Sequence, residues 1–211
     1  MNEVTKFGGS NLPSVKSLAA ALRSVSGPSN MVIIKCDKTG HWVFGAESLE
    51  IEDDSLWAVN PFSFVHGYIA WGEGEVLAEK MVSVNEPLPE IGPAPAGAEK
   101  GWEVQVGMTL ACTNGHDEGL QARYSATSVG GKRAVNALGM AIAEQVDKDQ
   151  TKPVPVVSLK SQHYMHKKYG KIYAPIFDIV KWVSMDATSA EEDAEAAEAP
   201  AEDAPRRRRR S

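Results

Sequence analysis

The chain has 211 residues, 43% of them hydrophobic, which is enough to bury one core, so a single domain with appendages is expected. Two cysteines, Cys36 and Cys112, are too few for a disulfide framework and favour a reducing compartment. The first residues lack the apolar stretch of a secretory signal, and no apolar run approaches the roughly 20 residues of a membrane helix. The sequence therefore predicts a soluble, cytoplasmic protein with no membrane partner.

Charge is distributed unevenly along the chain. Residues 1–100 carry 13 acids and 7 bases, whereas residues 101–185 carry 7 acids and 10 bases. The segment from Asp186 onward holds 8 acids and 5 arginines. No acid occurs in the 28 residues from Gln150 to Phe177, where lysines are frequent. The net charge of −6 therefore does not exclude an anionic partner for the back half of the chain.

Residues 1–30 are expected to form an N-terminal extension with a short helix, because apolar side chains recur at helical spacing between Pro13 and Gly27. The runs that follow are aromatic and β-branched and are broken by Gly, Pro and Asn, which is typical of strands. Strands are expected at 31–37, 41–46, 55–60, 63–71 and 76–84, the first two forming a hairpin. The Pro- and Gly-rich residues 86–101 are expected to be a surface loop or linker.

The back half has the clearest strand pattern. Residues 102–112 and 120–127 alternate apolar and polar side chains on either side of a turn, as a half-buried antiparallel hairpin does. Val104 and Val106 begin the apolar face of the first strand, and Tyr124 lies on the apolar face of the second. Strands are expected at 154–159 and 171–183, after a helix at about 131–147 whose apolar face is formed by Val135, Leu138, Ile142 and Val146.

This order of elements predicts a mainly β fold with one or two short helices. Two strands, a helix and two more strands, preceded by further strands, suit a curled antiparallel sheet such as an OB-like β-barrel over residues 31–185. Residues 186–211 are low-complexity Ala, Glu, Asp and Pro followed by five arginines. They lack the apolar residues that would offset ordering entropy, so a disordered acidic tail is expected.

The stretch "HYMHKKYGKIY", residues 163–173, can be interpreted as a metal-site fragment, as a nucleic-acid-binding surface, or as plain strand sequence whose lysines face water. His163 and His166 could be a fragment of a metal site, but a structural zinc site needs four ligands, and the two cysteines stand far apart. A nucleic-acid-binding surface needs cations that contact phosphates and aromatic rings on which bases stack, and this stretch contains both lysines and tyrosines. We therefore expect no metal and no cofactor, and a nucleic-acid-binding surface.

Within this hypothesis each residue type has its own role. Lysines would neutralise phosphates and tyrosines would offer stacking faces, each stack being worth about 1–3 kcal/mol. One or two of the tyrosines are expected to pack inward, because strands favour tyrosine. The candidate phosphate residues are Lys160, Lys167, Lys168 and Lys171, the candidate stacking residues are Tyr164, Tyr169 and Tyr173, and Arg123, Lys132 and Arg133 form a further outer track.

Lys132 and Arg133 fall in the first turn of the expected helix, where the helix macrodipole disfavours cations. An anion shared with the free N–H groups of the helix would explain this placement. Two solvated charges that cost a few tenths of a kcal/mol would explain it equally well. The sequence "SVGGKRAV" around them does not fit a phosphate-binding P-loop, because Ala126 and Arg133 stand where that motif needs Gly and Ser or Thr.

The segments "KTGHWVFGAE", "WAVNPFSFVHGYIAW", "GKRAV" and "YMHKKYGKIYAPIFDIVKW" together resemble the OB-fold single-stranded DNA-binding proteins of tailed bacteriophages. The resemblance is one of overall pattern and covers about residues 30–185 and the acidic tail. It implies non-catalytic binding of displaced or replicating single strands in the host cytoplasm. It also implies contact with phage or host replication proteins through the tail acids Glu191, Glu192, Asp193, Glu195, Glu198, Glu202 and Asp203. Many such tails end in an apolar tip, whereas this chain ends in Arg206–Arg210 and Ser211.

Single-stranded DNA binding during phage replication or recombination is therefore the function that the sequence favours, with homo-oligomers left open. One alternative is a virion or assembly protein whose β-core makes protein contacts. The other is a nucleic-acid-processing enzyme that uses the acidic run Glu50–Asp54 with Mg²⁺.

Overall fold

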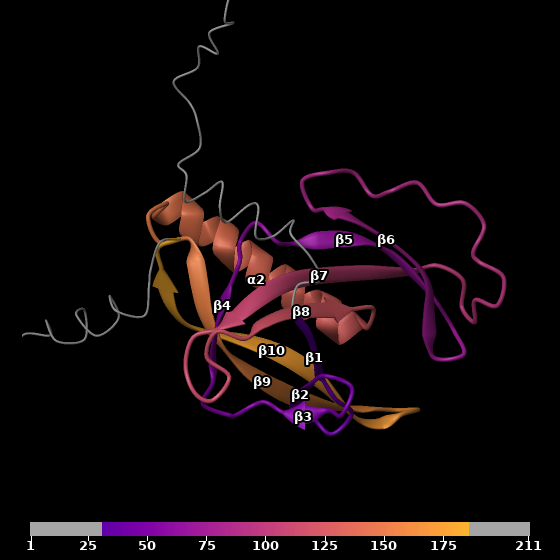
Figure 1. Ribbon diagram of the computed structural model, residues 1–211, viewed down its shortest axis with the longest axis horizontal. Coiled ribbons are helices and arrows are strands. Elements are labelled where there is room, and N and C mark those ends of the chain that lie inside the picture. Colours follow the sequence, from indigo (N-terminus) through magenta and orange to yellow (C-terminus); the bar gives the residue numbers. More distant parts are fainter. Residues whose placement is uncertain (1–30, 186–211) are drawn as a thin grey trace, which may run out of the picture. The chain divides into compact units, whose positions relative to one another are not determined.

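The computed structural model describes residues 31–185, so the expected N-terminal helix and the acidic tail lie outside the described residues. Within this range the protein is mainly β, a curled half-barrel sheet with one helix, as the sequence predicts (Figure 1). The first strands are Val32–Cys36 (β1), Trp42–Phe44 (β2), Leu49–Glu50 (β3), Leu56–Val59 (β4), Val65–Gly72 (β5) and Glu75–Ser83 (β6). The others are Glu103–Cys112 (β7), Gln121–Ala126 (β8), Val154–His166 (β9) and Gly170–Val183 (β10), with the helix α2 at Val129–Lys148.

The connectivity of the central strands is OB-like. β7 pairs antiparallel with both β4 and β8, the chain then forms α2, and β9 returns to pair with the other side of β4. β10 pairs with β9, which completes a strand order of β10-β9-β4-β7-β8. β1 joins this sheet in parallel beside β8 and carries β2 and β3. Five strands in this order, with the helix between the third and the fourth, form an OB-like barrel.

An aromatic cluster joins strands from the two ends of this order. The Trp42 ring of β2 lies 5.5 Å from both Tyr124 of β8 and Phe177 of β10, measured between ring centroids. The Trp42 indole Nε1 donates a hydrogen bond of 2.9 Å to the Lys160 carbonyl oxygen on β9. Tyr124 is buried, as the alternation in its strand predicts, and burial raises the pKa of its hydroxyl. The cluster therefore joins the hairpin β9–β10 to β2 and β8.

The helix begins at Val129, two residues before the expected start, because Ser128 caps it. The Ser128 hydroxyl accepts a hydrogen bond of 3.1 Å from the Gly131 N–H. Val135, Leu138 and Ile142 are buried and pack the helix against the sheet. At 20 residues the helix is longer than the short helices expected from the sequence.

Strands β5 and β6 form a hairpin beside the first half of β7, here called the wing. Residues 86–101 are irregular, as predicted, but they follow the wing and do not separate two domains. The Lys80 ammonium donates a hydrogen bond of 3.0 Å to the Glu90 carbonyl, and the Trp102 indole donates one of 3.0 Å to the Gly92 carbonyl. These side-chain hydrogen bonds tie the irregular segment to β6 and to the residue that precedes β7.

The wing also overturns the predicted faces in the first half of β7. Val104 was expected to face the core and is 42% exposed, whereas Gln105 was expected on the polar face and is 3% exposed. The wing covers the Gln105 face, and the Gln105 amide donates a hydrogen bond of 2.6 Å to Glu79 Oε1. The predicted alternation is correct from Met108 onward, where the apolar side faces the barrel interior.

Candidate functional site

The stretch 163–173, here called the arm, is the outer end of the β9–β10 hairpin. It was expected to join two shorter strands, but both strands continue through it, and His166 pairs with Gly170 across the turn. Gly170 has a φ of 72°, a left-handed conformation that glycine adopts without strain. In an OB fold the loop between the last two strands is one of the elements that bind oligonucleotides. The arm occupies that place.

Strand register divides the arm into two faces, because side chains alternate and paired residues share a face. Tyr164 pairs with Ile172, and Gln162 pairs with Ala174 one step nearer the core. These residues and His166 form the first face. The second face carries His163, Met165, Lys171 and Tyr173.

The second face rests on the turn between β1 and β2. Tyr173 is half-buried, and its ring lies directly against Gly40. The Lys171 ammonium lies 4.8 Å from the centroid of this ring, and the His163 ring lies 5.7 Å from it. Tyr173 was predicted to be a stacking residue, but its ring is occupied in fixing the arm to the barrel.

The first face and the turn hold the exposed rings. Tyr164 is 48% exposed and Tyr169 is 66% exposed. The Tyr169 ring stacks on His166 at a centroid distance of 4.9 Å and an interplanar angle of 25°. His166 was considered above only as a metal ligand, although its position two residues after Tyr164 already placed it on the same strand face. The Tyr164 ring and the Tyr169 ring, which stacks on the His166 imidazole, are therefore both accessible to solvent.

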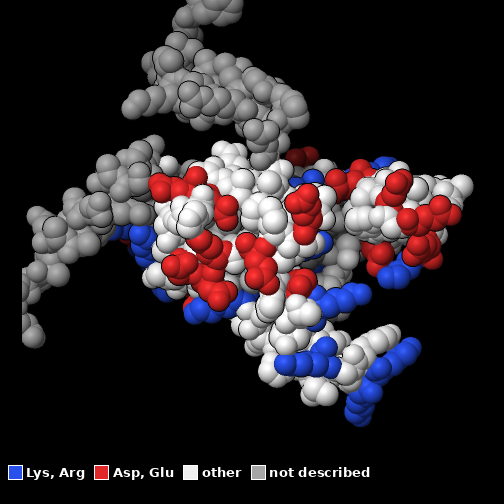
Figure 2. All heavy atoms as spheres, turned by 60° about the horizontal axis from the view of Figure 1, so that its bottom comes forward, with Lys and Arg blue, Asp and Glu red and all other residues white. Residues whose placement is uncertain are grey.

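The cations at the end of the arm are not neutralised by neighbouring acids. Within residues 31–185, Lys167, Lys168 and Lys171 form no ion pair. Figure 2 shows blue cationic side chains without red ones over the lobe that projects at the bottom, while carboxylates are spread over the body. Figure 1 places the end of the β9–β10 hairpin at this projecting side. The end of the arm is thus a cationic surface with two exposed aromatic rings.

Two of the predicted cations do not belong to this surface. The Lys160 ammonium forms an ion pair with Asp178 on the neighbouring strand. The Arg123 guanidinium lies 2.6 Å from Glu79 Oε1 of the wing and donates a hydrogen bond of 3.1 Å to the Ser125 hydroxyl. The charges of Lys160 and Arg123, both predicted to contact phosphates, are therefore each compensated by an acid that is distant in sequence.

Because the helix begins at Val129, Lys132 lies in its first turn, as predicted, whereas Arg133 begins the second turn. Arg133 is exposed and lines a groove that the arm residue Tyr164 also lines. Lys132 is only partly exposed and does not line this groove. Of the outer track, Arg133 alone is brought next to the arm.

The acidic run at Glu50–Asp54 is paired with histidines. His41 Nδ1 lies 2.7 Å from Glu50 Oε1, and His116 Nδ1 lies 2.6 Å from Glu52 Oε1. The hydrogen bond from the His116 side chain lowers the pKa of the Glu52 carboxyl below its usual value. In the part of the chain that the structure describes, no three His, Cys, Asp or Glu side chains converge in a geometry suited to a metal ion. The run thus joins two loops by hydrogen bonds.

The contact between Gly40 and Tyr173 predicts a large loss of stability on Gly40→Ala. A methyl group on Gly40 would lie 2.6 Å from Tyr173 Cε1, and the φ of 92° is unfavourable for alanine. Strain and overpacking together are expected to lower the free energy of unfolding by about 2–4 kcal/mol, measured by urea denaturation. In the background of Tyr173→Ala the same change should cost only about 1–2 kcal/mol, because the conflict with the ring is gone and only the backbone strain and the contact with the Ser161 hydroxyl remain. Equal costs in both backgrounds would contradict the proposed packing.

The fold and the site together define an OB-like β-barrel with a cationic, aromatic arm. No protein-family model matches this chain, and no curated protein or solved structure matches it either. Within residues 31–185, no helix combines the length and the apolar character needed to cross a bilayer.

Proposed function

We propose that this protein binds single-stranded DNA through the arm, without strong sequence preference and without catalysis, during phage replication or recombination. The observation that carries the proposal is the exposure of Tyr164 and Tyr169 on an arm that also carries three lysines without ion pairs, at the end of the last hairpin of an OB-like barrel. Single-strand binders combine a cationic path for the backbone with aromatic faces on which bases stack. The arm has both parts.

The same surface fits a single strand better than a duplex. Stacking on Tyr164 or Tyr169 needs a base whose face is free, and bases within a duplex are stacked on each other. Stacking also accepts any base, since every base has a π-face. Low sequence preference is therefore the expected behaviour.

Within this proposal, the arm rather than the sheet face provides the electrostatic attraction. OB folds often bind oligonucleotides over their second and third strands, which correspond here to β7 and β8. The cation on that surface is Arg123, and Glu79 already compensates its charge. Phosphates would therefore gain most from Lys167, Lys168 and Lys171.

The tail extends the proposal to partners. Its acids at 191–203 lie outside the described residues, and a segment of this composition would compete with phosphates for the arm or bind basic surfaces of replication proteins. We expect a chain truncated after Met185 to bind oligo-dT more tightly than the full chain at low salt. Equal affinity would rule out competition by the tail.

A fluorescence anisotropy titration of the full chain with labelled oligo-dT tests the proposed function. Saturable binding is expected, with an affinity that falls steeply between 50 and 200 mM salt, since counterions are released on contact with phosphates. A duplex of the same length should bind more weakly, and the oligonucleotide should be recovered uncleaved in the presence of Mg²⁺. No binding at low salt would refute the proposal, and cleavage would favour a processing enzyme.

A further inference from the structure

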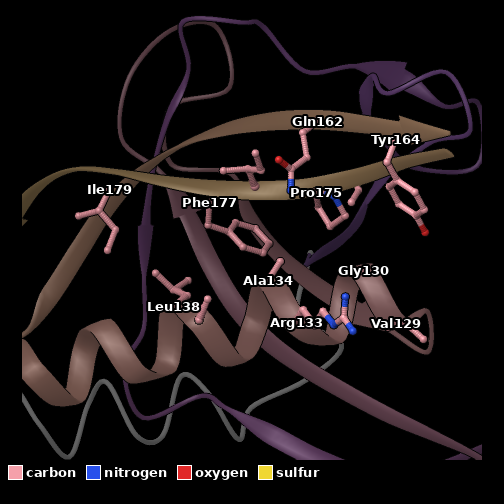
Figure 3. Close-up of a pocket in the computed structure, with 13 residues that line it drawn as sticks. Val129, Gly130, Arg133, Ala134, Leu138, Gln162, Tyr164, Pro175, Phe177 and Ile179 are labelled. Atoms are coloured by element: carbon pink, nitrogen blue, oxygen red, sulfur yellow. The ribbon is translucent and has the colours of Figure 1, made fainter. Parts of the chain in front are cut away.

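A groove runs between the first half of α2 and the β9–β10 hairpin, directly next to the arm (Figure 3). Its volume is about 430 Å³, within the range of about 300–1,000 Å³ that is usual for small-molecule sites. Leu138 of the helix and Pro175 and Phe177 of β10 are among the apolar side chains that line it. Gly130 closes one end, since its Cα approaches Ala174 so closely that a methyl group there would lie 3.1 Å from the Ala174 Cβ.

The polar groups of the groove lie where the arm meets it. Figure 3 shows Gln162 and Tyr164 directed from β9 toward the helix, with Arg133 on the helix side. None of the residues that line the groove is an acid. Within the described range, neither the Gln162 amide nor the Arg133 guanidinium has a hydrogen-bond partner. The groove thus has an apolar floor with one cation and one free amide at its rim.

Tyr164 belongs both to the groove and to the exposed face of the arm. Gln162, Tyr164 and His166 follow one another on a single strand face, and Tyr169 stacks on His166. Two strand residues span about 7 Å, so the two aromatic surfaces are about that far apart along the arm. A single-stranded nucleic acid that runs from the stacked rings of His166 and Tyr169 toward the barrel core would therefore reach Tyr164 and then the groove.

We infer that the groove is a base-binding subsite, which receives one unstacked nucleobase of the single strand whose phosphates lie on the arm. This inference rests on the proposed function and adds a second contact region to it. The base would lie between the Tyr164 ring and the apolar floor, and the Gln162 amide would hydrogen-bond to its edge. Arg133, at the positive end of the helix, would contact the adjoining phosphate.

The subsite can be blocked without changing the arm. Ala137 lines the groove and is exposed, so Ala137→Phe would fill the groove and leave the core intact. Gln162→Ala removes the amide and changes no charge. The same alanine-to-phenylalanine change at Ala143, which is exposed on the same helix and does not line this groove, provides the matched control.

The experiment measures affinity for labelled oligo-dT, oligo-dC and oligo-dA as a function of salt. Ala137→Phe is expected to weaken binding about tenfold, in the lower part of the range for one lost base stack. Gln162→Ala should reduce the differences in affinity among the three oligonucleotides, because the edge contact is lost. Neither change should alter the salt dependence, since no phosphate contact is removed, whereas Arg133→Ala should lower the salt slope by about 0.7.

The outcomes separate this inference from the proposed function. Full affinity of Ala137→Phe and Gln162→Ala, together with weakened binding by Lys167→Ala/Lys168→Ala, would overturn the subsite and leave the arm in place. Equal losses for Ala137→Phe and Ala143→Phe would also overturn it, since the effect would not be specific to the groove. Absence of binding by the unmodified chain would refute both the base-binding subsite and the proposed function. Circular dichroism and thermal unfolding of each variant confirm that the fold is retained.

Discussion

Replacing both Tyr164 and Tyr169 by alanine is expected to weaken oligo-dT binding by about 100-fold. Each base stacked on an aromatic side chain is worth about 1–3 kcal/mol, and every 1.4 kcal/mol is a factor of ten in affinity. Both rings are largely exposed, so their removal costs little folding free energy. Anisotropy titration at fixed salt measures the loss.

The matched control for this double variant is Phe62→Ala. Phe62 is 75% exposed and lies in the loop between β4 and β5, outside the arm and the groove. Its removal should leave the affinity unchanged. A double tyrosine variant that binds as tightly as the unmodified chain would show that the arm holds the backbone alone, without base stacking.

The second large effect is expected for Lys167→Ala/Lys168→Ala. Each lost phosphate contact on a single strand lowers the slope of log affinity against log salt by about 0.7, so the double variant should lose about 1.4. At 50 mM salt the affinity should fall by at least about tenfold, and at high salt the two proteins should converge. A salt series of titrations measures both quantities.

A charge-matched control variant distinguishes an effect of the arm from an effect of the overall net charge. Lys100, in the irregular segment 86–101, and Lys148, at the end of α2, are exposed lysines outside the arm. Lys100→Ala/Lys148→Ala changes the net charge by the same amount. If its salt slope falls as far as that of the arm variant, binding depends on the overall charge and not on the arm.

The sequence predicted those parts of the fold that depend on local periodicity. The alternation at 121–126 identified Tyr124 as buried, and helical spacing at Val135, Leu138 and Ile142 identified the face of α2. The order of elements was sufficient to predict an OB-like barrel. In each case a side chain's environment follows from its own strand or helix.

The errors arose where a second layer decides the environment. Gln105 is buried only because the wing covers β7, and the parallel pairing of β1 with β8 joins segments about 90 residues apart in the chain. Neither arrangement leaves a pattern in the residues concerned. Alternation shows that a strand has two faces, but it does not show which of them another element will cover.

In the candidate site, too, local sequence patterns were predictable and the packing between elements was not. The interleaved lysines and tyrosines were visible in the sequence, but the separation of Tyr173 from Tyr164 and Tyr169 follows from the hairpin register and from Gly40. The stretch without acids ends one residue before Asp178, and the register of β9 and β10 places that residue within reach of Lys160. Gln162 could have been identified, because it lies two residues before Tyr164 and so faces the same side.

The arm is the outer end of two long strands, 13 residues in β9 and 14 in β10, that begin in the barrel core. It is therefore a preorganised element, and no loop has to become ordered when a ligand arrives. The association rate should then approach the limit set by diffusion and electrostatic steering, with little conformational entropy lost by the protein. An arm built in this way would hold a ligand without closing around it. Under the proposed function the protein would then release a strand by simple dissociation, so an enzyme advancing along the same strand could displace it without waiting for a conformational change.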